Sequence, residues 1–140
     1  MPASSNASDL LADLIARART AGADAADAML VESAGLSATR RLGKLEKVER
    51  AEGLDLGLRV FIGRRQAIVA TGDLTGASLG RLVENALAIA RAVPEDRYAG
   101  LADADQIARD LPERDLDDGQ EPSAEALGDL AAAAEDAALA

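Results

Sequence analysis

An acidic run near the end of the chain resembles a calcium-binding loop in its composition. The run consists of Asp115, Asp117, Asp118, Gly119 and Glu121. Calcium takes oxygen ligands, and the loop of an EF-hand requires glycine at its sixth position. With Gly119 at that position, the first and third ligand positions fall on Arg114 and Leu116, which cannot ligate a cation. The run is therefore interpreted as a solvated acidic linker.

The stretch from Gly72 to Gly80 follows an expected strand and precedes an expected helix, which is where phosphate-binding loops occur. Its sequence, GDLTGASLG, has neither the Lys-Ser/Thr pair of a P-loop nor the GxGxxG order of a dinucleotide-binding loop. Asp73, Thr75 or Ser78 can instead accept hydrogen bonds from the free amides of a helix start. The simpler interpretation is a capped helix start.

Two further residue classes bear on catalysis. Glu46 and Glu49 could in principle act as an acid–base pair, but nothing in the sequence places them in a pocket or beside a nucleophile. The chain contains no histidine and no cysteine, so it has neither the usual imidazole ligands of zinc nor thiolate ligands or disulfides. The sequence alone therefore indicates no group of residues that could form a catalytic site.

A string of basic residues in the middle of the chain is the one candidate binding surface. It consists of Arg40, Arg41, Lys44, Lys47 and Arg50, interleaved with Glu46, Glu49 and Glu52. Mixed charges on a strand are typical of a solvated face with cross-strand ion pairs, and they also block unwanted edge pairing. The functional alternative is a sheet edge that accepts an extended peptide as an added strand.

Alternating apolar and polar side chains predict the strands, because successive side chains of a strand point to opposite faces of its sheet. The alternation is clearest over residues 54–62, where five aliphatic side chains recur at every second position. Shorter strands are expected at 26–33, 36–42 and 45–50, with turns at Ala34-Gly35 and Gly43-Lys44. Gly63-Arg64 should begin a hairpin that returns through residues 66–71.

Helical spacing of apolar residues predicts helices at about 8–21 and 75–93, and a third that begins near Ser123. Strands joined by short turns are antiparallel, so the expected class is α+β. We expect a meander of four to five strands with two helices on one face, plus a C-terminal helix. The expected organisation is a core at 1–94, an acidic linker at 95–122, and a helix at 123–140 that leads into an absent C-terminal domain.

The charge of the chain is uneven. Residues 1–94 hold 12 basic and 11 acidic groups, a net charge of +1, whereas residues 95–140 hold 3 basic and 14 acidic groups, a net charge of −11. Nucleic acids require clustered cations and, for single strands, aromatic platforms. The chain has one Phe, one Tyr and no Trp, so direct nucleic-acid binding is not expected. With no signal-like or membrane-spanning segment in the sequence, we expect a cytoplasmic protein.

Residues 30–62 resemble the N-terminal domain of the TldD/PmbA family. The matching features are "LSATRRLGKLEKVE", the run "GLDLGLRV" that ends in a hairpin, "ATGDLT", "LVENALAIARAV", "PEDRYAGLAD" and the acidic "LPERDLDD" before a new helix. They follow one another in order over roughly residues 8–140. The stretch 94–103 makes the chain more similar to the PmbA (TldE) branch than to the TldD branch.

The resemblance implies a subunit of a two-subunit metallopeptidase that degrades or trims peptides and unfolded protein segments. It places zinc on a TldD-like partner, in an HExxxH helix of a C-terminal domain, and it carries no catalytic, cofactor-binding or metal-binding residue over to this chain. The family has also been named as a modulator of DNA gyrase.

From the residues and the resemblance together we expect a non-catalytic N-terminal domain that lines the substrate cleft and contacts the TldD-like subunit. The basic string at Arg40–Arg50 is the expected peptide-edge surface. The alternative is a non-enzymatic, gyrase-modulator-like adaptor that binds a protein. A third possibility is a scaffold domain whose helices mediate only dimer contacts.

Overall fold

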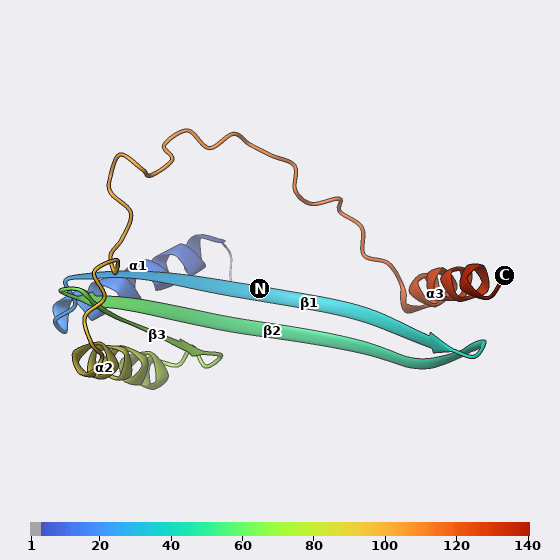
Figure 1. The fold of residues 1–140 in the computed structure, drawn as a ribbon, viewed down its shortest axis with the longest axis horizontal. Coiled ribbons are helices and arrows are strands. Elements are labelled where there is room, and N and C mark those ends of the chain that lie inside the picture. Colours follow the sequence, from blue (N-terminus) through green and yellow to red (C-terminus); the bar gives the residue numbers. More distant parts are fainter. Residues whose placement is uncertain (1–3) are drawn as a thin grey trace. The chain divides into compact units, whose positions relative to one another are not determined.

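The computed structural model describes residues 4–140, which form three helices and three strands (Figure 1). In chain order the elements are α1 (Ser4–Thr20), β1 (Ala25–Arg41), β2 (Lys44–Ile62), β3 (Arg65–Thr71), α2 (Gly76–Ala92) and α3 (Ala124–Leu139). The strands form one sheet in the order β1-β2-β3, with adjacent strands joined by two-residue turns. The α+β class and the C-terminal helix are therefore confirmed.

The expectation of four to five strands is wrong, because the sheet of the described residues has three. The expected turn at Ala34-Gly35 lies inside β1, and Gly53 lies inside β2. Neither Gly35 nor Gly53 has a positive φ, and nothing lies within 4 Å of a Cβ built at Gly35. A glycine in an exposed strand stays extended where the neighbouring strand holds it, so these glycines weaken the strand without ending it.

The turn between β1 and β2 lies one residue earlier than expected. Leu42 has a φ of 51° and Gly43 a φ of 74°. Two consecutive left-handed residues make a type I′ turn, whose twist matches that of the strands it joins. The left-handed conformation costs a leucine about 1 kcal/mol, because its Cβ approaches the backbone carbonyl oxygen.

The chain divides into two compact units. The first consists of residues 4–32 and 53–107, and the second of residues 33–52 and 108–140. In the first unit, β2 pairs with β3 in antiparallel register, with Val60 opposite Ala67 and Leu58 opposite Val69. The alternation predicted for residues 54–62 is confirmed, since Leu56, Leu58 and Val60 are completely buried.

Both helices of the first unit contribute to the core that covers this face. The buried residues of α1 and α2 are aliphatic and belong to one cluster with those of the sheet. Figure 1 shows α2 lying along β3, in agreement with their contacts. The helix side chains of this cluster are Leu14, Ala18, Leu79, Leu82, Val83, Ala86, Leu87 and Ala90.

The ends of α2 and the start of α3 follow the expected caps, whereas α1 begins at Ser4, earlier than the expected start at about residue 8. Thr75 accepts a hydrogen bond from the amide of Ser78 at 3.4 Å, and α2 ends at Val93 before Pro94. Ser123 accepts a hydrogen bond from the amide of Ala126 at 3.1 Å and caps α3. The interpretation of Gly72–Gly80 as a capped helix start is thus confirmed. Between α2 and α3, residues 101–123 are all exposed and contain no helix or strand.

The side chain of Asp73 accepts hydrogen bonds at the start of α2, and the effect of its protonation on this helix start can be measured. Its carboxylate accepts hydrogen bonds from the Thr75 amide at 2.9 Å and the Thr75 hydroxyl at 3.1 Å. These bonds, first the amide and then the hydroxyl, hold the pKa of Asp73 below its ordinary value of 3.8. A lowered pKa gives stability that is complete above the ordinary pKa and is lost as the pH falls through the folded value.

We therefore expect the Thr75 and Ser78 amides to lose hydrogen-exchange protection as the pH falls below 3.8. After correction for intrinsic exchange rates, this loss should be absent in Asp73→Asn, which cannot titrate. An Asp73→Asn variant with the same pH dependence as the wild type would contradict the assignment.

Candidate functional site

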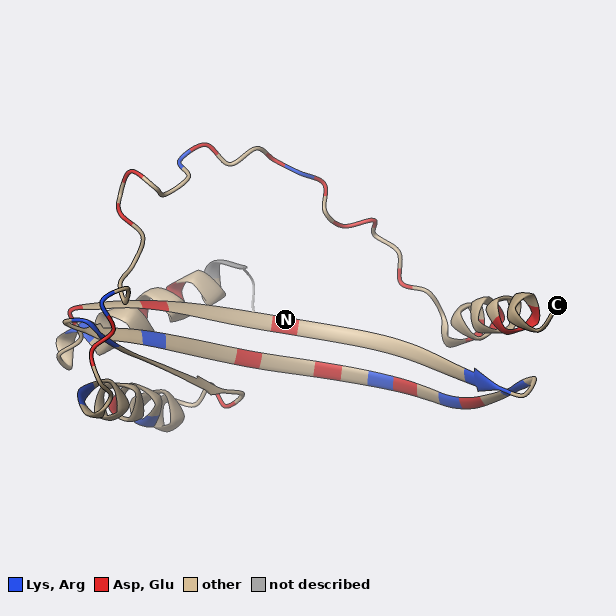
Figure 2. Ribbon diagram, viewed as in Figure 1, with Lys and Arg blue, Asp and Glu red and all other residues tan. Residues whose placement is uncertain are grey.

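The five basic residues of the expected peptide-edge surface lie in one hairpin of the second unit. Arg40 and Arg41 end β1, and Lys44, Lys47 and Arg50 follow on β2. Figure 2 shows basic residues at the turn and alternating basic and acidic residues farther along β2. The hairpin therefore brings all five residues onto neighbouring strands, but their contacts differ.

Three of these cations form ion pairs with nearby glutamates. Lys47 Nζ lies 2.7 Å from Glu49, and Arg50 lies 2.9 Å from Glu52, each pair being two residues apart on β2. Arg41 lies 3.9 Å from Glu46 across the turn. All six side chains are more than half exposed. Such pairs contribute about 0–1 kcal/mol each, so they make a solvated, nearly neutral face.

The expectation of cross-strand pairs is thus only partly met, because two of the three pairs run along β2. Residues two apart on a strand lie on the same face, which brings Lys47 close to Glu49 and Arg50 close to Glu52. The charges of these two pairs neutralise one another along the strand.

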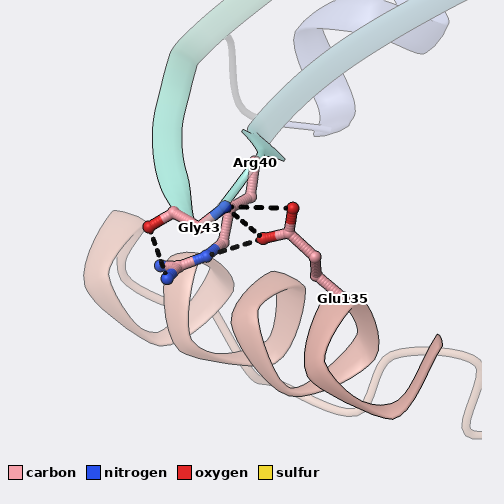
Figure 3. A network of polar contacts seen from close by, with 3 residues as sticks. All are labelled: Arg40, Gly43 and Glu135. Atoms are coloured by element: carbon pink, nitrogen blue, oxygen red, sulfur yellow. Dashed lines mark hydrogen bonds and ion pairs between the residues drawn. The ribbon is translucent and has the colours of Figure 1, made fainter. Parts of the chain in front are cut away.

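Arg40 differs from the other four because it binds α3. Its Nε donates to Glu135 at 3.2 Å, and the Gly43 amide donates to both oxygens of the same carboxylate at 3.1 Å (Figure 3). Arg40 Nη2 also donates to the Gly43 carbonyl oxygen at 2.9 Å. The side chains are 26% and 18% exposed, so this network is the most enclosed ion pair described.

Glu135 was missed by the sequence reasoning, although its position on α3 carries a signal. The half-buried residues of α3 recur three or four apart and end with this glutamate. They are Ala124, Leu127, Gly128, Ala131, Ala132 and Glu135. Gly128 lies next to Leu45, whose Cδ1 is 3.9 Å from a Cβ built at the glycine, an ordinary contact distance. This stripe of α3 therefore packs on the hairpin.

The backbone edge of β2 is free over the half of the strand nearest the turn. β3 pairs only with Leu56–Ile62, so residues 44–53 have β1 on one side and no strand on the other among the described residues. The two-residue turn makes Arg41 and Lys44 a hydrogen-bonded pair. Counted from the turn, alternation directs the amides of Leu45 and Lys47 away from β1, toward the free edge. Farther along β2 the phase changes, since the Asp24 amide donates to the Phe61 carbonyl oxygen at 2.9 Å and residue 61 therefore faces β1.

A second polar feature lies on the sheet of the first unit. Arg59 donates through Nε to Asp27 at 2.9 Å and also contacts it through Nη2, while its guanidinium lies 5.2 Å from the centre of the Phe61 ring. The hydrogen bond to Asp27 raises the pKa of Arg59 above its ordinary value. Met29, Gly57 and Ile68 line a shallow hollow beside the pair. The sequence reasoning did not identify this pair.

The described residues do not fit a zinc site. The chain has no histidine or cysteine, and residues 4–140 contain no group of three or more acidic side chains placed to hold a metal ion. Within the same residues, no helix combines the length and apolar character that a membrane span requires.

Comparison with known proteins gives consistent matches. Residues 26–90 match the family model described as PmbA/TldA metallopeptidase domain 1. The chain is 36% identical over 122 residues to "Metalloprotease PmbA homolog" of Haemophilus influenzae, covering 87% of this chain and 27% of that protein. It is also 36% identical over 116 residues to "Metalloprotease PmbA" of Escherichia coli O157:H7, covering 83% of this chain and 26% of that protein.

A solved structure shares the fold. It is a protein of Bacteroides thetaiotaomicron named as a modulator of DNA gyrase, with a TM-score of 0.70 and 21% identity. The match covers 81% of this chain and 25% of that chain. The chain thus spans about a quarter of the length of the proteins that it matches.

Proposed function

Because the chain belongs to the PmbA/TldD metallopeptidase family, with residues 26–90 forming its first domain, we propose that it is the N-terminal, non-catalytic domain of a PmbA-like (TldE-type) subunit. In this proposal the domain lines the substrate cleft of a cytoplasmic heterodimer with a TldD-like subunit. The substrates are peptides or unfolded protein segments, and the free edge of β2 holds them in an extended conformation.

The free edge at residues 44–53 is the observation that carries the proposal. An unpaired edge offers a row of amides and carbonyl groups that can pair with any extended peptide, because main-chain bonds do not depend on side-chain identity. The neutralised charges along β2 support this use, since Lys47 and Arg50 are already paired with Glu49 and Glu52. Such an edge suits a peptidase that acts on many sequences.

The proposal assigns zinc to the TldD-like partner. The residues of this chain would not hold the metal themselves, since they include neither imidazole nor thiolate ligands. The metal would supply the activated water for hydrolysis. The contribution of this domain is to hold and align the peptide main chain, which lowers the entropic part of the barrier.

Lys47→Pro in the full-length subunit, assembled with its zinc-bearing partner, tests the edge. Proline removes the outward amide at position 47, and a single edge proline is tolerated in a strand. We expect peptide turnover to fall about fivefold, the equivalent of one hydrogen bond of about 1 kcal/mol. The matched control, Lys47→Ala, removes the same charge and keeps the amide, so its turnover should stay within twofold of the wild type.

The position of the proline matters. Leu42 is unsuitable because its φ of 51° is incompatible with proline. Val48 is unsuitable because its amide faces β1, so a proline there would break the hairpin itself. Intact amide protection at Lys44, whose amide faces β1, will show that Lys47→Pro keeps the hairpin. Unchanged turnover in that folded variant would contradict the proposal.

A further inference from the structure

The turn between β1 and β2 has the chemistry of an anion site. Two donors from one turn, the Gly43 amide and Arg40 Nε, converge on a single carboxylate at 3.1–3.2 Å (Figure 3). A backbone amide beside a guanidinium is an arrangement that binds carboxylates through charge-assisted hydrogen bonds. In this structure the carboxylate belongs to Glu135, which is 92 residues away from Gly43 in the sequence.

The hairpin itself positions both donors. The left-handed conformations of Leu42 and Gly43 turn the Gly43 amide outward, where no backbone acceptor of the hairpin receives it. Arg40 is fixed by its own bond to the Gly43 carbonyl oxygen, which leaves Nε directed at the carboxylate. Neither feature depends on Glu135, so the donors keep their places when the glutamate is removed.

The surroundings favour an anion from solution. Gly43 is exposed, and Leu42 is 82% exposed, so the turn is open to solvent. Arg41 and Lys44 line a hollow next to the turn, with Leu42, Leu45 and Glu46. Arg40, Arg41 and Lys44 place three positive charges at the turn, and Glu46 and Glu135 place two negative charges near it. The local excess of positive charge attracts anions.

We propose that this turn is a carboxylate-binding site in which Glu135 is an internal occupant that competes with an external carboxylate. The external ligand is the carboxylate of a peptide, and this identification rests on the proposed function. A glutamate tethered in place has a high effective concentration, so it weakens the apparent binding of any competitor. Glu135 is part of α3, and the contact between Leu45 and Gly128 helps to hold this helix on the hairpin. The packing of α3 therefore keeps Glu135 close to the site.

The test is a titration of the ¹⁵N-labelled chain that follows the Gly43 amide resonance. Glu135→Ala vacates the site, and Asp136→Ala, an exposed carboxylate next to it on α3, is the matched control. We expect N-acetylalanine to bind Glu135→Ala at least about tenfold more tightly than the wild type, a difference of one charge-assisted hydrogen bond. Asp136→Ala should bind as the wild type does.

Three probes identify the ligand. N-acetylalanine carries a terminal carboxylate, the α-amide of N-acetylglutamate carries only a side-chain carboxylate, and N-acetylalaninamide carries none. Binding of the first alone assigns the site to peptide C-termini, and binding of the first two assigns it to carboxylates in general. Equal shifts with the neutral amide, or no gain in Glu135→Ala, would overturn the proposal.

Two further variants keep the result interpretable. Glu135→Gln retains an acceptor for the Gly43 amide and holds α3, so it should bind N-acetylalanine more weakly than Glu135→Ala. Arg40→Met in the Glu135→Ala background should lose the gain, and persistence of the gain would contradict the role of Arg40. The probes are too short to add a strand to β2, so a negative result here leaves the edge proposal standing. Conversely, unchanged turnover in Lys47→Pro leaves the carboxylate site standing.

Discussion

Replacing Leu58 by alanine is expected to lower the free energy of unfolding by about 3 kcal/mol. Leu58 is completely buried in the first unit, opposite Val69 and beneath the helices. The substitution removes apolar contacts and leaves a cavity. Because β2 lies between β1 and β3, the sheet cannot shift to close this cavity. Urea unfolding followed by circular dichroism will measure the change as a lower transition midpoint at an unchanged slope.

Ile68→Ala is the matched control for Leu58. Ile68 is an aliphatic residue on the neighbouring strand, but it is 68% exposed and points away from the core cluster. We expect its replacement to change the free energy of unfolding by less than about 0.5 kcal/mol. Similar losses in the two variants would show that the buried face has been assigned to the wrong residues.

Replacing Phe61 by alanine is expected to lower the free energy of unfolding by about 4 kcal/mol, the middle of the range for a buried aromatic side chain. Phe61 is the one phenylalanine of the chain and is 2% exposed, although it alternates with the inward-facing Val60 and Ile62. The ring also carries the Arg59 guanidinium over its face, at 5.2 Å. The loss should appear in the same urea transition as that of Leu58→Ala.

Tyr98→Ala separates burial from the cation–π contact. Tyr98 has an arginine over its ring at 5.1 Å, like Phe61, but it is 81% exposed. An exposed contact of this kind contributes about 0.5–1 kcal/mol, so Tyr98→Ala should cost no more than that. A large loss in Tyr98→Ala, or a small one in Phe61→Ala, would show that burial does not set the difference.

The parts of the fold that local pattern determines could be predicted from the sequence. The stripe of α2, its Thr75 and Val93 ends and the Ser123 cap of α3 follow from spacing and capping within a few residues. The alternation over 54–62 identified the buried face, because only one face of that strand meets the helices. The Gly63 hairpin was also predictable, since Gly63 has the positive φ that such a turn requires.

The remaining features depend on residues that are distant in sequence. Gly35 resembles a turn residue, but the neighbouring strand holds both Gly35 and Gly53 extended inside β1 and β2. Glu135 reaches Arg40 over 95 residues, and Arg59 reaches Asp27 over 32, so no local window contains either pair. The burial of Phe61 was unpredictable for the same reason, because its alternation with Val60 predicts exposure. The basic string could be read from the sequence, but the bond between Arg40 and Glu135 depends on α3, which is distant in the sequence.

The exposed stretch from 101 to 123 has a practical consequence for engineering the chain. It makes few fixed contacts, so an inserted tag, fluorophore or protease site there displaces no buried side chain. Lengthening a flexible connection is thermodynamically inexpensive, since each doubling costs only about 0.6 kcal/mol. Cleavage at a protease site placed in this stretch would separate α3 from the rest of the chain. The helix would then bind the hairpin as an independent peptide, and the time of cleavage would set when it can dissociate.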